Sequence, residues 1–122
     1  MNKAIIGLGS NIDAPANLNR AVELLKEQFS VVKVSQWMQT QPIGITEQPV
    51  FFNGVLVMET TLELKPLETA LKNLEDRMGR DRTRPKFGPR EIDLDVILWN
   101  GQVVDDDYYT RDFLQSLVRE VL

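Results

Sequence analysis

The stretch GPREIDLDVILWNG, residues 88–101, holds the clearest strand and the clearest turn of the chain. Its apolar residues alternate with two acids, which predicts a β-strand with one side toward a core. The apolar set is Ile92, Leu94, Val96 and Leu98. Asp93 and Asp95 then share the opposite side. Asn100-Gly101 is typical of a two-residue hairpin turn, so the chain is expected to return as a short strand through 102–104.

The segments around this strand have the periodicity of further strands and helices. We predict strands at 3–9, 31–38 and 50–62, helices at 13–29, 66–79 and 112–121, and loops at 40–49, 80–90 and 105–110. Asp13 and Asp112 are expected to cap their helices, and Gly79 to end the second one. GLGS (7–10) predicts a tight turn, not a phosphate-binding loop, because it lacks the third glycine of the dinucleotide motif.

The order of these elements predicts the fold class. Strand–helix–strand repeated twice indicates an α+β protein, a ferredoxin-like βαββαβ sandwich whose antiparallel sheet carries two long helices on one face. A hairpin strand and a C-terminal helix follow. The other face of the sheet is expected to be free for a ligand.

The composition predicts a single domain over residues 1–122. The chain is 43% hydrophobic, enough for one core. It has no apolar run near 18 residues, no signal-peptide pattern at its N-terminus and no cysteine. We therefore expect a cytoplasmic protein with no membrane partner.

The charged residues restrict the chemistry. Histidine is absent, so the usual acid–base group near neutral pH and the commonest transition-metal ligand are both missing. Carboxylates, arginines, hydroxyl groups or a hard metal ion must do any chemistry. The net charge is −4, yet residues 77–90 carry six cations and one acid. This asymmetry indicates an anion site and argues against a broad nucleic-acid-binding surface.

Asp93 and Asp95 have two interpretations. Strand geometry places their Cα atoms roughly 6.5–7 Å apart, so the carboxylates could hold one hard cation or two neighbouring ones. Polar–apolar alternation is also ordinary on a solvent-facing side of a sheet. The arginine-rich segment leads into this strand, and acids beside arginines are what Mg²⁺ and a polyphosphate need. Phe51 and Asn53 share a strand face and would suit a flat heterocycle, although core packing and a turn role are ordinary alternatives.

Five motifs together resemble one family. They are GLGSN (7–11), TQPIG (40–44), EQPVFFNGVLVMETTL (47–62), LEDRMGR (74–80) and FGPREIDLDVILW (87–99). They resemble 6-hydroxymethyl-7,8-dihydropterin pyrophosphokinase of folate biosynthesis. The resemblance implies the same ferredoxin-like fold and the Mg²⁺-dependent transfer of pyrophosphate from ATP to the hydroxymethyl group of the pterin, with release of AMP. Relative to that family, the chain is expected to be a short member without the usual C-terminal part.

The resemblance also implies roles for individual residues. Two Mg²⁺ ions would be held by Asp93 and Asp95. The catalytic positions would be Arg80, Arg82, Arg90 and Asp95. The pterin would be bound by Thr40, Pro42, Ile43, Phe51 and Asn53. The co-substrate ATP would be bound by Glu75, Arg80, Arg82, Lys86, Arg90, Val96 and Thr110.

Two functions remain open on sequence grounds. One is the ATP-dependent pterin diphosphokinase, and the other is a catalytically weakened paralogue that binds a pterin or a nucleotide in a regulatory or partner role. The short C-terminal part favours the second, whereas the acids and arginines favour the first. Arg111 and Phe113 could replace missing C-terminal ligands in space, although their sequence positions do not match. An RNA-binding module is disfavoured because its aromatic motif is missing, and a homodimer is expected if apolar surface stays uncovered.

Overall fold

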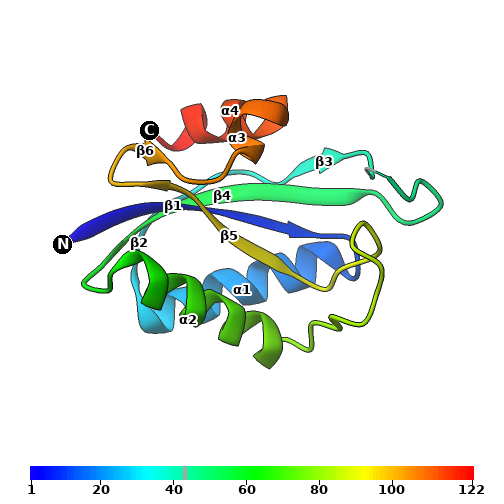
Figure 1. The fold of residues 1–122 in the computed structure, drawn as a ribbon, viewed down its shortest axis with the longest axis horizontal. Coiled ribbons are helices and arrows are strands. Elements are labelled where there is room, and N and C mark those ends of the chain that lie inside the picture. Colours follow the sequence, from blue (N-terminus) through cyan, green and yellow to red (C-terminus); the bar gives the residue numbers. More distant parts are fainter. Residues whose placement is uncertain (43) are drawn as a thin grey trace.

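The computed structural model describes residues 1–42 and 44–122. Its centre is a six-stranded sheet in the order β2-β4-β1-β5-β6, with β3 paired to β4 (Figure 1). The strands are β1 (Asn2–Ser10), β2 (Ser30–Val34), β3 (Met38–Thr40), β4 (Phe51–Thr60), β5 (Asp93–Trp99) and β6 (Gln102–Val103). The paired strands are antiparallel. The first βαβ unit and its repeat thus form one sheet, which confirms the predicted ferredoxin-like class.

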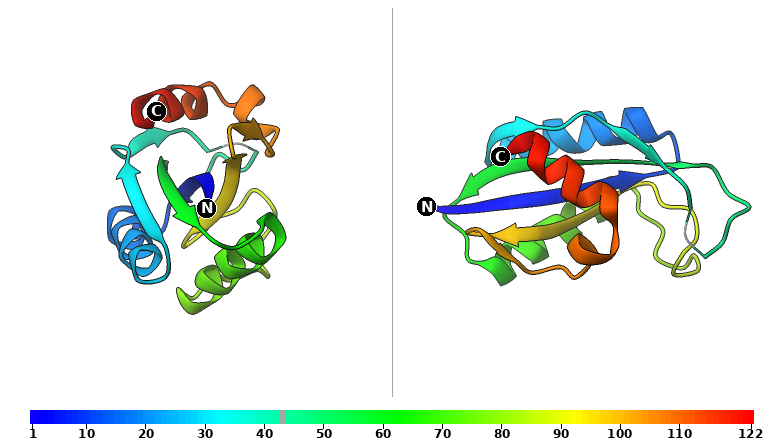
Figure 2. Two further views of the ribbon diagram at one scale, coloured as in Figure 1. Left: turned by 90° about the vertical axis from the view of Figure 1, so that its left-hand side faces the viewer. Right: turned by 90° about the horizontal axis from the view of Figure 1, so that it is seen from above.

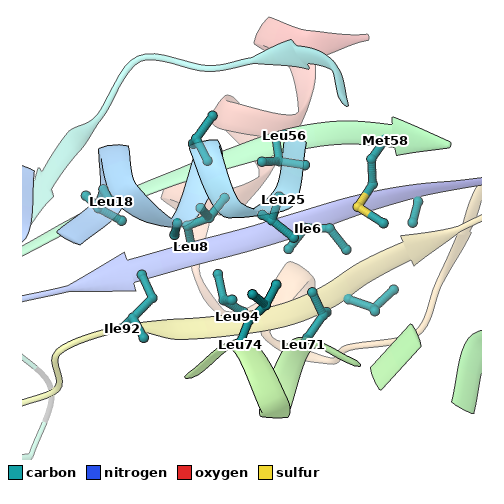
Figure 3. Packing of buried hydrophobic residues seen from close by; sticks show 14 of the residues in the cluster. Ile6, Leu8, Leu18, Leu25, Leu56, Met58, Leu71, Leu74, Ile92 and Leu94 are labelled. Atoms are coloured by element: carbon teal, nitrogen blue, oxygen red, sulfur yellow. The ribbon is translucent and has the colours of Figure 1, made fainter. Parts of the chain in front are cut away.

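Two long helices, α1 (Ala14–Gln28) and α2 (Leu64–Arg77), lie on one face of the sheet (Figure 2). Their apolar sides form the main core with β1, β4 and β5, as Figure 3 shows. Its buried members include Ile6, Leu8, Leu18, Leu25, Leu56, Met58, Leu71, Leu74, Ile92 and Leu94. Each buried leucine or isoleucine contributes about 2 kcal/mol, so this layer holds β5 firmly against the helices.

Two shorter helices, α3 (Asp107–Thr110) and α4 (Asp112–Val121), lie on the opposite face (Figure 1). A second core forms there between α4 and the sheet; it contains Ile5, Val55, Val57, Ile97, Leu114, Leu117, Val118 and Val121. The backbone N–H of Gln36 also donates to Glu120 of α4 at 2.6 Å. The expectation that this whole face is free for a ligand is therefore wrong, because its apolar residues need a cover. No helix in the described part of the chain is long and apolar enough to cross a bilayer.

β5 carries one residue more than the stretch of β1 opposite it. Val96 pairs with Ile6, but Leu98 pairs with Ile5, so Ile97 is the extra residue of a β-bulge. The bulge turns Leu98 toward α4. The prediction that Leu98 continues the helix-facing set is therefore wrong, whereas the other three members of that set do face the helices.

Three local predictions are corrected by the backbone. The strand expected at 31–38 is divided into β2 and β3, because the Ser35 N–H donates to the Val55 carbonyl and the Ser35 hydroxyl accepts the Val55 N–H, both at 2.9 Å. GLGS is not a turn, since β1 continues through Ser10. The loop expected at 105–110 contains the single helical turn of α3.

Of the three helix ends predicted from single residues, two differ in the structure and one is as predicted. Asp13 precedes α1 with a left-handed backbone, and within the described residues its side chain makes no capping hydrogen bond. Arg111, rather than Asp112, precedes α4. Gly79 follows the end of α2 with a φ of 84°, as predicted for a glycine stop.

The hairpin turn between β5 and β6 is confirmed and gives a first testable prediction. Asn100 and Gly101 have φ values of 49° and 83°, as a type I′ turn requires. Gly101→Ala is expected to lower the free energy of unfolding by about 1 kcal/mol, because an L-residue is strained in this region. No described atom lies within 4 Å of the added Cβ, so the loss comes from the backbone alone. Urea unfolding of wild type and Gly101→Ala measures the loss, with the exposed change Gln102→Ala as the control. Equal unfolding midpoints for Gly101→Ala and wild type would contradict the prediction.

Candidate active site

At one end of the sheet, three strands bring Gly9, Asn53 and Asp93 next to one another. Gly9 of β1 pairs with Asn53 in β4 and with Asp93 in β5. A Cβ on Gly9 would lie 2.8 Å from Asn53 Oδ1, so only glycine lets this carboxamide lie over β1. The three residues form the floor of a pocket, called here the aromatic pocket.

The walls of the aromatic pocket come from other segments. They are Thr40, Gln41, Phe51, Phe87, Arg90, Arg111 and Phe113. Asn53 Nδ2 donates a hydrogen bond of 2.5 Å to Thr40 Oγ1, which fixes how the amide points. Three aromatic rings with a few placed polar groups are typical of a site for a flat, polar-edged ligand.

The structure brings together three of the five residues predicted to bind a pterin. Thr40, Phe51 and Asn53 line the aromatic pocket. Pro42 is half-buried and is not among the described residues that line it. Ile43 lies outside the described residues. Phe51 and Asn53, which were predicted to share one face of a strand, therefore both line a pocket.

A second depression, called here the acidic hollow, adjoins the aromatic pocket. Its acids are Asp93, Asp95, Asp105 and Asp107, and its other residues are Lys86, Phe87, Arg90, Thr110 and Arg111. Asp93 is held by Arg80 at 3.1 Å and by Arg90 at 2.7 Å. Asp95 lies 3.5 Å from the ammonium group of Lys72. The two acids thus share a face, as predicted, and each has a cation beside it.

Burial in the acidic hollow disfavours the charged form of two carboxylates. Burial, followed by the nearby charge of Asp93, raises the pKa of Asp95 to about 6, although Lys72 opposes the shift. Burial also raises the pKa of Asp105 above its ordinary value. Carboxylates that resist ionisation in this way are stabilised by any cation that enters the hollow.

The donor groups of the acidic hollow fit a hard cation. Among the described residues, no three acidic side chains converge to form a complete metal site. Mg²⁺ is usually bound by one or two carboxylates and takes its remaining ligands from water and phosphate. Asp93 and Asp95 can supply those two carboxylates, so the chemistry of the site suits Mg²⁺ that arrives with a nucleotide.

Glu75 joins α2 to both the acidic strand and the arginine-rich segment. Its carboxylate is completely buried and accepts the backbone N–H of Leu94, between the two acids, at 2.6 Å. It also accepts a hydrogen bond from Arg82 at 2.8 Å and lies 3.3 Å from Arg80. Its hydrogen bond raises the pKa of Arg82 above the ordinary value. The prediction that Glu75 touches ATP stays a prediction, because here its partners are protein groups.

The remaining ATP-binding predictions divide into two groups. Lys86, Arg90 and Thr110 line the acidic hollow. Val96, Arg80 and Arg82 are not among the described residues that line it. The Val96 side chain is buried in the main core, whereas Arg80 pairs with Asp93 and Arg82 with Asp76. Arg90 is also fixed by its backbone, which exchanges hydrogen bonds with Asn11 at 2.8 and 3.1 Å.

Sequence reasoning missed three groups at this site. Lys72 stands one helical turn before Glu75, and that i, i+3 spacing could have placed its ammonium beside the acids. Asp105 and Asp107 were assigned to a polar loop, yet they face Asp93 across the acidic hollow. Asp105 and Asp107 reach the acidic hollow because the chain after β6 crosses back over the sheet. No local sequence pattern predicts that path.

The fold is that of a ferredoxin-like α+β domain, and its site combines paired acids, an arginine-rich segment and an adjoining aromatic pocket. Comparison of the sequence with models of known protein families then identifies the family. The sequence model of 7,8-dihydro-6-hydroxymethylpterin-pyrophosphokinase matches residues 5–122. The chain belongs to this family.

Several curated relatives carry the same name, 2-amino-4-hydroxy-6-hydroxymethyldihydropteridine pyrophosphokinase. The protein of Bacillus subtilis is 36% identical over 109 residues, which are 87% of this chain and 65% of the relative. That of Aquifex aeolicus is 35% identical over 105 residues, 85% of this chain and 65% of the relative. That of Pseudomonas putida is 32% identical, over 84% of this chain and 87% of the relative. The chain thus spans about two thirds of the length of the first two relatives.

Proposed function

We propose that this chain transfers pyrophosphate from ATP to the hydroxymethyl group of 6-hydroxymethyl-7,8-dihydropterin, giving the pterin diphosphate and AMP, a step of folate biosynthesis. One observation carries the proposal: the aromatic pocket and the acidic hollow share Phe87, Arg90, Asp93 and Arg111. A heterocycle in the first and a polyphosphate in the second would therefore meet. Family membership supports the same reaction.

The aromatic pocket would bind the pterin through its faces and its edge. Phe51 would stack on the ring, and the Asn53 amide would pair with the ring's donors and acceptors. Because Thr40 fixes the orientation of that amide, the pterin would have one preferred direction in the pocket. That direction would bring its hydroxymethyl group toward Asp93 and the acidic hollow.

The reaction needs charge stabilisation more than acid–base chemistry, which suits a chain without histidine. The hydroxymethyl oxygen forms a bond to the β-phosphorus of ATP, and its proton is released to solvent water. The bond between the β-phosphorus and the α–β bridging oxygen breaks, and AMP leaves with that oxygen. Arg80, Arg82 and Arg90 would offset the negative charge on the phosphoryl oxygens. Lys86 and Thr110 would contact the phosphates from the edge of the hollow.

Asp93 and Asp95 would hold Mg²⁺, and we propose two ions. Bound Mg²⁺ neutralises phosphate charge and favours in-line displacement. The raised pKa of Asp95 supports this role, because the carboxylate has few compensating groups of its own. Lys72 would hold Asp95 in place when no cation is bound.

The test of the function is the formation of AMP. Wild-type protein is mixed with Mg²⁺, ATP and 6-hydroxymethyl-7,8-dihydropterin, and AMP is followed by chromatography. We expect AMP and pterin diphosphate in equal amounts, and no product when EDTA removes the metal. Binding of both substrates without AMP would instead favour the weakened paralogue. The homodimer, the cytoplasmic location and the absence of a nucleic-acid partner stay predictions.

A further inference from the structure

Lys72 joins two layers of the molecule at the acidic hollow. It belongs to α2, which covers the sheet face opposite α4 (Figure 2), yet its ammonium Nζ lies 3.5 Å from Asp95 Oδ1. Among the described residues, β6 pairs with β5 only at Leu98 and Trp99, so the edge of β5 beside Asp95 has no neighbouring strand. The lysine can therefore reach round this open edge from the helix layer to the acid.

The two acids of β5 differ in the cations that face them. Asp93 lies 3.1 Å from Arg80 and 2.7 Å from Arg90, whose side chains are only 14% and 24% exposed. Within the described part of the chain, Asp95 makes a single ion pair, with Lys72, whose flexible side chain is 48% exposed. The cation beside Asp95 is thus the one that can move away most easily.

Lys72 has a second carboxylate with which it can remain. Its Nζ also lies 3.5 Å from Glu75 Oε2, one helical turn further along α2. The other oxygen of Glu75, Oε1, faces Arg80 and Arg82. The ammonium can therefore leave Asp95 without losing every counter-charge, and the main cost of placing a metal ion at Asp95 is the repulsion between two neighbouring cations.

We propose that Lys72 is an internal counter-ion of Asp95 that weakens the binding of a free divalent cation and favours the cation that arrives on ATP. A bare divalent ion at Asp95 would be repelled by the ammonium nearby. The complex of that ion with ATP has a net negative charge, so the same ammonium attracts it. Lys72 would thus be a positioning residue that selects the form in which the metal enters. The inference rests on the proposed function, because it takes ATP as the co-substrate.

The test measures two dissociation constants for each protein at pH 8, where Asp95 is ionised because its pKa is about 6. The first ligand is Mn²⁺ alone, which accepts the same hard oxygen ligands as Mg²⁺ and is followed by electron paramagnetic resonance. The second is the equimolar complex of Mn²⁺ with α,β-methylene ATP, which does not react, followed by isothermal titration calorimetry. Lys72→Met removes the charge and keeps a long side chain. We expect the Kd of Mn²⁺ to fall about fivefold and the Kd of the nucleotide complex to rise about fivefold.

Two further variants test whether the charge is responsible. Lys72→Arg keeps a cation beside the acid and is expected to leave both constants within about twofold of wild type. Lys65→Met removes an exposed lysine from the first turn of the same helix. That residue lies about 10 Å away along the helix axis, a full Debye length at moderate salt, so neither constant should change.

Three outcomes would overturn the proposal. The first is Lys72→Met protein with both constants unchanged. The second is a shift of both constants in the same direction with a lower melting temperature, which would make Lys72 structural only. The third is Lys72→Arg protein that behaves like Lys72→Met, since the charge would then not be the cause.

The AMP assay on wild-type protein decides the proposed function separately. Opposite shifts of the two constants in Lys72→Met, with no AMP formed by wild type, would support the role of Lys72 and contradict the proposed reaction. Wild-type protein that binds neither Mn²⁺ nor its nucleotide complex would overturn both.

Discussion

Asp95→Asn is expected to lower the rate of AMP formation by about 10³-fold while the protein stays folded. The change removes a carboxylate that would bind Mg²⁺ and replaces it with a neutral group of the same shape. It removes no core volume, because Asp95 lies at the acidic hollow rather than in either core. The measurement is kcat with saturating Mg²⁺, ATP and pterin, beside circular dichroism. Activity within tenfold of wild type would exclude the metal role.

The same variant is expected to stabilise the metal-free protein. Burial raises the pKa of Asp95 to about 6, so the folded protein loses stability as the pH rises from the ordinary value of 3.8 to about 6. Its side chain is 42% exposed, and solvent screening reduces the penalty to about 1 kcal/mol. In EDTA, the free energy of unfolding of Asp95→Asn should therefore exceed that of wild type by about 1 kcal/mol at pH 8 and should equal it below pH 4.

A matched control exists for both experiments. Asp106 is an exposed acid close to the same hollow but outside its lining, so Asp106→Asn should leave activity and stability unchanged. Urea unfolding at the two pH values compares the variants. If Asp95→Asn were less stable than wild type at pH 8, the carboxylate would be stabilising the fold, contrary to the expectation.

Glu75→Ala is expected to lower the free energy of unfolding by about 3 kcal/mol. The change leaves the N–H of Leu94 without its acceptor and removes the buried counter-charge of Arg80 and Arg82. It should also reduce activity, because each arginine loses one of the groups that orient it. Urea unfolding and the AMP assay measure the two effects. Glu68→Ala, an exposed change on the same helix, serves as the control.

A gentler variant separates the two consequences. Glu75→Gln keeps an acceptor for Leu94 but loses the charge that Arg80 and Arg82 face. We expect a folded protein whose activity still falls, mainly through weaker binding of the nucleotide. If Glu75→Ala and Glu68→Ala unfolded at the same urea concentration, the buried carboxylate would not be joining α2 to the acidic strand.

The sequence predicted the elements well because each has a strong local pattern. Alternation in 91–99 placed Asp93 and Asp95 on one face, and the Asn-Gly pair located the hairpin turn. The motif residues Thr40, Phe51 and Asn53 then meet in one pocket. Local pattern and tertiary structure agree at these positions because one face of each strand points toward a core.

The sequence predicted less well where two distant segments determine the outcome. The apolar stripe of α4 shows that it must pack against something, but not which face of the sheet it covers. A signal was present in β4, where the run of apolar residues 55–58 indicates burial on both faces. The position of Phe113 follows from that choice of face, so it could not be derived from α4 alone.

The extra residue in β5 has a consequence for how such chains can diverge. Beyond Ile97, Leu98 faces α4 and Trp99 faces the two long helices. Deleting one residue here would exchange these two side chains and press an indole against the short helix. A change in chain length within this strand is therefore disfavoured, and alignments of related proteins should be ungapped through it.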